Sequence, residues 1–372
     1  MKKTKLLHIT SSLKIGGAEV LLCDIIEKLG NQEFEHEVIF FHNGPRAQRL
    51  KKLGITLHHV RGLVCMYDPI FFARLFRLIK KLKPDLIHSL LWAANVSSRL
   101  FAKLLKIPHV CAYHAHIDQD GQLRKKIDMA TLRFADHVVA VSQSVANSFL
   151  CAVPEKKKKS VMVIENGIDA HAIRERAKTE KVLRKELGFA EDDFVIGAVG
   201  RFTHHKNFPL LLESFALVHN LLPHVRLVLL GTGPDEQMLK DVAQKLGVAQ
   251  YVAFVVGQSA YGYFPLFDCF VQSSNTEGIS IALLEAMSFG LPCVVIETGA
   301  AHPVIEGGKT GLLVKKSDAS LLGQNICKLA TDRAFAQKIG AASRQNVEAR
   351  FSIEGMVGAY KKLFLGLSNR NC

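Results

Sequence analysis

The sequence predicts an α/β protein built from two Rossmann-like, doubly wound domains. Short apolar runs of strand length alternate with longer helical patterns along the chain, and the alternation starts afresh after the turn at residues 166–169. Runs this apolar are typical of parallel strands that helices cover on both faces. The length of 372 residues also suits two domains.

The first domain is expected to span residues 1–170. Its first strand lies in the basic start MKKTKLLHITSS, which holds too few apolar residues for a signal peptide. The expected strands are 5–9, 36–41, 55–60, 86–90, 109–114, 137–142 and 161–164, and helical patterns are found at 18–29, 45–53 and 69–82.

The second domain is expected to span residues 171–352. Its expected strands are 194–200, 225–231, 251–257, 268–273, 293–296 and 311–314, and its helical patterns include 208–220, 234–246, 280–289 and 318–330. A last helical stretch, at about 353–372, has no strand of its own and is expected to pack back on the first domain. Because ligands of such folds bind at the carboxyl ends of strands, the cleft between two facing domains is the expected site.

Composition and charge narrow the class of protein. Apolar residues form 48% of the sequence and charged residues 22%, as in globular proteins. The eight cysteines contain no Cys-x-x-Cys pair, which favours reduced thiols in a cytoplasmic protein. No apolar run reaches the roughly 18–20 residues that span a bilayer. Residues 1–170 hold 26 Lys and Arg against 15 Asp and Glu, which is most of the formal net charge of +14. Such a field attracts nucleic acid, anionic lipid or a phosphorylated small molecule.

Two glutamates, Glu277 and Glu285, belong to the stretch SSNTEGISIALLEAMSFG. Glu277 is expected in a loop and Glu285 in the helix that begins near Ser280, so both can face one ligand. The amides of Ile279, Ser280 and Ile281 would point at an anion, which the positive end of the helix also attracts. A diphosphate suits this position.

Two further motifs follow strands. Arg201 and Lys206 come after the first strand of the second half, and a forked guanidinium and an ammonium can converge there on one diphosphate without a metal. Gly16 and Gly17 come after the first strand of the chain, where the backbone can approach a ligand closely. This pair is not the Gly-x-Gly-x-x-Gly fingerprint, which argues against a nicotinamide enzyme.

In this order the motifs resemble those of the retaining family 4 glycosyltransferases, also called glycosyltransferase group 1. That family has the GT-B architecture of two facing Rossmann-like domains. The resemblance covers nearly the whole chain and rests on the ordered set of strings. These are Gly-Gly-Ala-Glu at 16–19, Val-Ser at 141–142, Asn-Gly-Ile-Asp at 166–169, Gly-Arg with Lys-Asn at 200–207, Gly-x-Gly-Pro at 231–234 and Glu-x7-Glu at 277–285.

The resemblance implies a role for each residue of a donor site. Arg201 and Lys206 match the pair that binds the donor diphosphate and stabilises the charge developing on it. Glu285 matches the glutamate that usually binds the ribose hydroxyls, and Glu277 matches the one beside the hydroxyls of the donor sugar.

The resemblance also assigns residues of the first domain. Gly16 and Gly17 match the loop that closes on the phosphates and helps to frame the acceptor. His114, expected at the end of strand 109–114, matches a histidine close to the transferred sugar. His116 would face the same way along an extended chain, so either histidine can be the one in the site.

One region departs from the family pattern. Pro303, in the string GAAHPVI at 299–305, stands where the family usually has a glutamate, so a polar contact is expected to be lost.

Three possible metal ligands lie close together in the sequence: His114, His116 and Asp118. Paired cations at a nucleotide-sugar site need no metal, however, and no His-Glu-x-x-His motif is present. No metal and no cofactor are expected, and a nucleotide diphosphate sugar is the expected donor substrate.

The helix expected at 69–82 is amphipathic and basic. Arg74, Arg77, Lys80 and Lys81 share one arc of it, and its apolar residues share another. Such a helix is either a core helix with a solvated basic face or a surface that meets anionic lipid. Together with the lysine tract 156–159, it suggests peripheral contact with the inner face of the cytoplasmic membrane.

We therefore expect a retaining glycosyltransferase that moves a hexose or N-acetylhexosamine from a nucleotide diphosphate sugar to a hydroxyl of a glycan or glycolipid. Its expected setting is the synthesis of bacterial cell-surface polysaccharide or lipopolysaccharide. One alternative is a hydrolysing nucleotide-sugar epimerase of the same fold, which needs a carboxylate base beside the sugar. The other is a basic nucleic-acid-binding protein, but the basic residues lie mainly on expected helices and loops, so no nucleic acid partner is expected.

Overall fold

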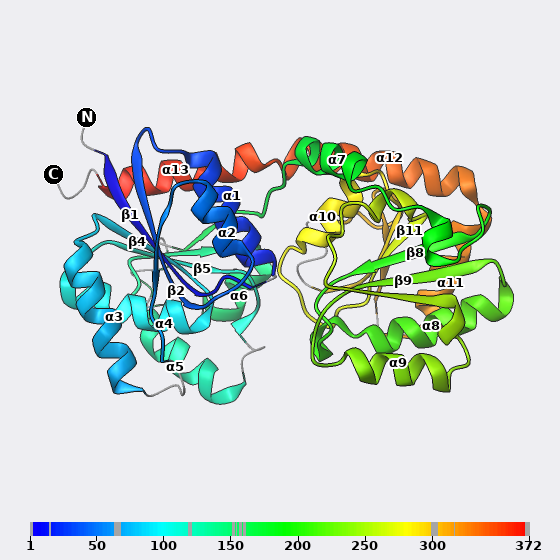
Figure 1. Ribbon diagram of the computed structural model, residues 1–372, viewed down its shortest axis with the longest axis horizontal. Helices are drawn as coiled ribbons and strands as arrows, with labels where there is room; N and C mark the ends of the chain where they lie inside the picture. The colour runs from blue at the N-terminus through cyan, green and yellow to red at the C-terminus, as the bar shows by residue number, and fades with distance from the viewer. Residues whose placement is uncertain are drawn as a thin grey trace. The chain divides into compact units, whose positions relative to one another are not determined.

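The chain divides into two compact units (Figure 1). The computed structural model describes residues 3–14, 16–62, 68–117, 121–150, 153, 155, 158, 161–298, 304–315 and 317–368. The first unit comprises the described residues of 1–166 and 353–372, and the second unit comprises those of 167–352. Each unit is a doubly wound parallel sheet with helices on both faces, which confirms the predicted fold class.

The sheet of the first unit has seven parallel strands in the order β3-β2-β1-β4-β5-β6-β7. They are β1 (Thr4–Ser12), β2 (Phe34–His42), β3 (Thr56–His59), β4 (Leu86–Leu90), β5 (His109–Tyr113), β6 (His137–Ala140) and β7 (Val161–Val163). The order reverses between β1 and β4, and ligands of such sheets bind beyond the strand ends at this kind of switch point. His114 lies just beyond β5, because the strand ends one residue earlier than expected.

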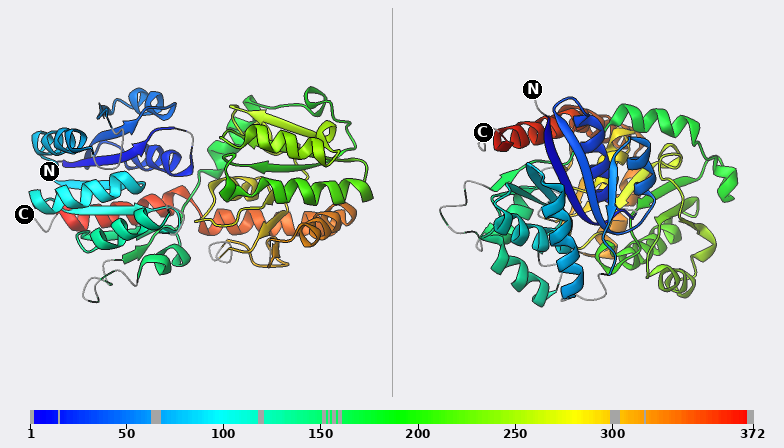
Figure 2. Two further views of the ribbon diagram at one scale, coloured as in Figure 1. Left: turned by 90° about the horizontal axis from the view of Figure 1, so that it is seen from below. Right: turned by 60° about the vertical axis from the view of Figure 1, so that its left-hand side comes forward.

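Helices cover both faces of this sheet. They are α1 (Gly17–Leu29), α2 (Arg46–Lys52), α3 (Pro69–Leu82), α4 (Trp92–Leu105), α5 (Gln122–Leu132), α6 (Gln143–Leu150) and α13 (Ile353–Ser368). The buried side of α3 packs with α4 against apolar residues of β1, β2 and β4. α13 lies beside α1 (Figures 1 and 2), and its Phe364 meets Phe34 of β2 edge-on with ring centroids 6.3 Å apart. The last helix of the chain is therefore part of the first unit.

The sheet of the second unit has six parallel strands in the order β10-β9-β8-β11-β12-β13, so its switch point lies between β8 and β11. The strands are β8 (Phe194–Val199), β9 (Val225–Gly231), β10 (Val252–Val256), β11 (Cys269–Gln272), β12 (Cys293–Ile296) and β13 (Leu312–Val314). The helices are α7 (Ala170–Thr179), α8 (Phe208–Leu221), α9 (Glu236–Lys245), α10 (Ile281–Ser288), α11 (Ala319–Thr331) and α12 (Arg333–Arg350).

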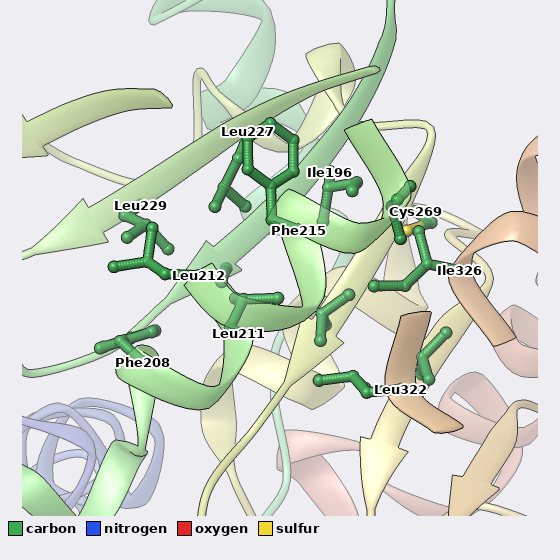
Figure 3. Close-up of a cluster of buried hydrophobic side chains, with 14 of the residues drawn as sticks. Ile196, Phe208, Leu211, Leu212, Phe215, Leu227, Leu229, Cys269, Leu322 and Ile326 are labelled. Carbon is green, nitrogen blue, oxygen red and sulfur yellow. The ribbon is translucent and has the colours of Figure 1, made fainter. Parts of the chain in front are cut away.

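The core of the second unit is apolar on both faces of the sheet. On one face Phe215 of α8 and Ile326 of α11 pack over Ile196, Leu227 and Cys269 of the strands (Figure 3). On the other face α10 and α12 cover the sheet with apolar side chains, among them Leu283 and Met287 of α10 and Val347 of α12. Burial of this apolar surface fixes the register of the central strands and with it the positions of the loops that follow them.

Some sequence features lie outside the described residues: Asp118, the string 299–303 that contains His302 and Pro303, and Lys156, Lys157 and Lys159 of the lysine tract. In the described parts of the chain, no helix has both the length and the apolar character needed to cross a bilayer. Cys23, Cys111, Cys269, Cys293 and Cys327 are free thiols.

Candidate functional site

Two loops of the second unit meet at the carboxyl edge of its sheet, at the switch point. One follows β8 and contains Arg201 and Lys206; the other follows β11 and contains Glu277. β8 and β11 pair in parallel, with Ile196 opposite Cys269, so their ends lie at the same edge (Figure 1). Sheet pairing therefore brings together two motifs that are about 70 positions apart in the sequence.

A cation and a carboxylate occupy the centre of this edge. Lys206 Nζ forms an ion pair with Glu277 Oε1, and the two side chains are 23% and 15% exposed. Ser274 Oγ donates to the same carboxylate oxygen at 2.8 Å. Two donors thus hold Glu277, and Glu277 in turn holds the Lys206 ammonium at the point where an anionic ligand can reach it.

Hydrogen bonds also join the two loops through their backbones. Ser273 Oγ donates to the Lys206 carbonyl at 2.8 Å, and the Asn275 amide donates to the His205 carbonyl at 2.9 Å. Asn207 has a φ of +50° and donates from Nδ2 to Asn275 Oδ1 at 2.9 Å. The motifs of the sequence did not point to Ser273, Asn207 or Asn275. Their signal was a run of small polar residues directly after a strand, which is also typical of an ordinary loop.

Arg201 is exposed, and no ion pair joins it to the described part of the chain. Two glycines lie close to its loop. A Cβ on Gly200 would lie 3.2 Å from Lys206 Cε, so the stem of that lysine passes over the glycine. A Cβ on Gly231 would lie 1.8 Å from the Gly200 carbonyl oxygen, so only glycine lets the end of β9 approach this loop.

The helix that follows the Glu277 loop begins as the sequence predicts. Ser280 caps α10, and its Oγ accepts from the Leu283 amide at 3.4 Å. Ile279 and Glu285 are buried, and Ile281 is the first helical residue. The positive end of α10 therefore starts beside the loop that carries Glu277, which favours an anion at this edge.

The glycine pair of the first unit lies where β1 gives way to α1. Gly16 is the residue before the helix and Gly17 is its first residue. A Cβ on Gly16 would lie 2.3 Å from Glu19 Oε2, so the Glu19 carboxylate turns back over that glycine. A side chain at position 16 would displace this carboxylate.

The two histidines after β5 have different surroundings. Both ring nitrogens of His114 are buried and have no hydrogen-bond partner among the described residues. Burial lowers the pKa of His114 to about 4, so the ring is neutral near pH 7. His116 Nε2 instead makes a 2.8 Å hydrogen bond with Ser144 Oγ. His114 is thus the histidine whose polar atoms have no partner in the described structure.

The basic face predicted for residues 69–82 lies on α3. Arg74, Arg77, Lys80 and Lys81 are exposed. The opposite side of α3 faces the core, where Phe71, Leu75 and Ile79 are buried. The cationic face of this helix is therefore open to solvent.

Two family descriptions match the chain. Residues 179–346 match "Glycosyl transferases group 1" and residues 15–172 match "Glycosyltransferase Family 4". The chain is 25% identical to N-acetyl-alpha-D-glucosaminyl L-malate synthase of Bacillus anthracis over 372 residues, covering 96% of this chain and 95% of the relative.

A second relative and a solved structure extend the comparison. UDP-Gal:alpha-D-GlcNAc-diphosphoundecaprenol alpha-1,3-galactosyltransferase of Escherichia coli is 22% identical, with 98% of this chain and 97% of the relative covered. The crystal structure of Anabaena Alr3699/HepE in complex with UDP and glucose matches with a TM-score of 0.87 and 22% identity, covering 98% of this chain and 100% of that one. This likeness confirms the GT-B fold class.

Proposed function

Since the chain belongs to the group 1, family 4 glycosyltransferases, we propose that it is a retaining enzyme that transfers a hexose or N-acetylhexosamine from a nucleotide diphosphate sugar. The acceptor in this proposal is a hydroxyl of a glycan or glycolipid used for bacterial cell-surface polysaccharide or lipopolysaccharide. The observation that carries the proposal is that the loop with Arg201 and Lys206 meets the loop with Glu277 at the switch point of the second sheet, where Lys206 pairs with Glu277.

Arg201 and Lys206 bind the donor diphosphate in this proposal. Lys206 is already oriented by Glu277, while Arg201 is free of ion pairs with the described residues and can reach a ligand. Both cations stabilise the negative charge that grows on the leaving diphosphate, so they act more strongly on the transition state than on the bound donor.

The other residues position the donor. We assign the ribose hydroxyls to Glu285, the donor sugar hydroxyls to Glu277 and a phosphate oxygen to the amides of residues 279–281 at the start of α10. In the first unit, Gly16 and Gly17 contact the phosphates, and His114 contacts the transferred sugar through a neutral ring.

The reaction then needs no protein nucleophile. The bond between the anomeric carbon and the diphosphate oxygen breaks, and the acceptor oxygen forms its new bond on the same side of the sugar. The acceptor proton passes to the departing phosphate oxygen, and the bonding electrons leave with the diphosphate. The contribution of the protein is positioning and charge stabilisation.

The donor is tested by thermal unfolding in the presence of UDP, GDP and ADP, because a ligand that binds the folded state raises its stability by an amount that grows with the logarithm of the affinity. One diphosphate should stabilise the protein, and Lys206→Ala should abolish that shift. Lys338→Ala is the matched control, because Lys338 is an exposed lysine of α12. No shift with any diphosphate would count against the proposal.

We also propose that the transfer requires no metal and no cofactor. Lys206 and Arg201 supply the positive charge that a metal ion would otherwise bring to the diphosphate. Enzyme treated with EDTA should keep its rate. Activity that disappears with EDTA and returns with Mg²⁺ or Mn²⁺ would overturn this part.

Finally, we propose that the protein works in the cytoplasm and touches the inner face of the cytoplasmic membrane through the basic face of α3. This face holds the exposed Arg74, Arg77, Lys80 and Lys81, and each such residue near an anionic surface contributes about 1 kcal/mol. The protein should co-sediment with anionic vesicles at low salt and should not co-sediment with neutral vesicles. The fourfold Gln variant should lose this binding; equal binding by that variant would exclude α3 as the contact.

A further inference from the structure

A groove of about 650 Å³ lies in the first unit between α2 and the edge strand β3. We call it the α2–β3 groove. Its lining residues are Phe40, Asn43, Gly44, Pro45, Ala47, Gln48, Lys51, Leu57 and His59. Its volume and its mixture of an apolar floor with a few polar groups are typical of sites for small ligands.

The floor of the α2–β3 groove carries a flat aromatic platform. Phe40 and His59 face each other in the β2–β3 register, and their rings stack at 4.7 Å with an angle of 8° between the planes. His59 Nε2 lies 3.0 Å from the Phe41 carbonyl, which can only accept, so this nitrogen carries the proton and the ring is held in place. Phe40 is buried and His59 is exposed, so the histidine offers its outer ring face to a ligand.

The charge of the groove is positive and uncompensated. Among the described residues, no acidic side chain lines it. Arg49, on the same helix, is neutralised by Asp24 and Glu27, whereas Lys51 forms no ion pair within the described structure. Gln48 and Asn43 add amide groups beside the platform. An anion in this groove would therefore meet a free ammonium and no repelling carboxylate.

We propose that the α2–β3 groove binds a sugar unit that carries a carboxylate or a phosphate, and that this unit belongs to the acceptor. The apolar face of the sugar ring packs on His59, its anionic group pairs with Lys51, and its hydroxyls bond to Gln48 and Asn43. The assignment of this unit to the acceptor rests on the proposed transferase function, whereas the binding itself does not.

Binding is measured by NMR titration of the full-length protein with glucose 6-phosphate, glucuronate, glucose and inorganic phosphate. One of the two anionic sugars should bind more tightly than glucose and than phosphate. Lys51→Gln should weaken that binding about tenfold, as expected for the loss of one charged contact. Lys52→Gln should leave it unchanged, because Lys52 is the neighbouring lysine of α2 and does not line the groove.

The ring platform has its own matched pair of variants. His59→Ala removes the ring and should weaken binding of the anionic sugar, whereas His59→Phe keeps a ring and should retain it. Equal effects of Lys51→Gln and Lys52→Gln, equal affinity for phosphate alone, or no binding of either anionic sugar would each overturn the proposal.

One further variant separates the groove from the donor site. Lys206→Gln should abolish transfer but leave binding of the anionic sugar unchanged, because Lys206 belongs to the second unit. If the anionic sugar binds but no nucleotide sugar ever supports transfer, the assignment to an acceptor is wrong and the assignment of the groove as a sugar site is retained. Sugar binding that disappears in Lys206→Gln would place the ligand at the donor loops and overturn the groove.

Discussion

The two units share the same kind of doubly wound sheet but place their polar groups differently. In the second unit apolar clusters pack on both faces of the sheet, and Lys206 and Glu277 lie beyond the strand ends, where a ligand can reach them. In the first unit polar side chains lie within the sheet and under its helices, and many are fully buried. Polar groups at strand ends are available to a ligand, whereas buried polar groups inside the sheet affect folding.

The clearest example inside the first sheet is a chain of three histidines. His36 Nε2 lies 3.0 Å from the Gly30 carbonyl, His36 Nδ1 lies 3.0 Å from His8 Nε2, and His8 Nδ1 lies 3.0 Å from His88 Nδ1. Because the carbonyl can only accept, His36 and His8 each carry their proton on Nε2, and His88 carries its proton on Nδ1. With this arrangement of protons, every hydrogen bond of the chain is made while all three rings are neutral.

A second example is a buried ion pair. Arg99 of α4 binds Asp128 of α5 at 2.6 Å, and both side chains are completely buried. Tyr113 of β5 donates to the same Asp128 oxygen at 2.6 Å. This cluster joins a strand and two helices, so the packing of the first unit depends on it.

The largest expected effect is on chemistry in the second unit. Arg201→Ala and Lys206→Ala should each lower kcat by about 10²–10³-fold, because each removes a charge that stabilises the leaving diphosphate. Circular dichroism should show that both variants fold, and steady-state kinetics measures the loss. Arg333→Ala, an exposed arginine of α12, is the control and should keep full activity. Rates within about threefold of wild type in both variants would contradict the role of the pair.

The next effect is on folding of the first unit. Arg99→Leu should lower the free energy of unfolding by about 3–5 kcal/mol, because it leaves the Asp128 carboxylate buried without its partner. Urea unfolding followed by fluorescence reports on this unit, since Trp92 of α4 is the single tryptophan. The double variant Arg99→Leu with Asp128→Leu should recover most of the loss, and no recovery would show that the uncompensated charge is not the cause.

Low pH should also lower the stability of the first unit. Burial lowers the pKa of His88 to about 3 and holds the pKa values of His8 and His36 below 6.5. The unfolded chain therefore binds more protons than the folded one once the pH falls below about 6.5, so the stability present above that pH decreases as the pH falls toward the folded pKa values.

The measurement is the urea midpoint from Trp92 fluorescence at pH 7.5 and pH 5.5, together with proton uptake on unfolding. The midpoint should be lower at pH 5.5. His204→Gln changes an exposed histidine of the second unit and should leave the pH dependence unaltered. A midpoint that is equal at the two pH values would contradict the neutral chain.

The smallest expected effect comes from the bonds that join the two loops of the second unit. Ser273→Ala removes the 2.8 Å bond to the Lys206 carbonyl and should cost about 1 kcal/mol of stability while raising KM for the donor several-fold. Ser97→Ala removes a comparable 2.7 Å bond to the Ala93 carbonyl in the first unit and should leave KM unchanged. An unchanged donor KM in Ser273→Ala would show that the bond does not position Lys206.

Much of the fold follows from local patterns. The runs 86–90, 225–231 and 293–296 were predicted with the bounds that β4, β9 and β12 have, because buried parallel strands are almost continuously apolar. α3 was predicted at 69–82, where Asp68 caps a helix with proline at its first position. The end of β5 was harder to predict, because His114 is compatible with the strand and with the loop.

Part of the candidate site could also be predicted from the sequence. Arg201, Lys206, Glu277 and Glu285 each stand out in a motif that follows a strand or begins a helix. The motifs could not predict the ion pair between Lys206 and Glu277 or the hydrogen bonds of Ser273 and Asn275. Each of these interactions joins residues about 70 positions apart.

Local patterns in the chain are enough to place the strands and helices and the charged residues that follow them, because periodicity and turn chemistry are local properties. The folded structure is needed to show which strand ends are neighbours, that the histidines of β1, β2 and β4 form one hydrogen-bonded chain, and that α2 and β3 enclose a groove beside Lys51. These are decided by strand order and by the packing of helices on the sheet, which depend on contacts between distant segments, and those contacts leave no local pattern in the chain.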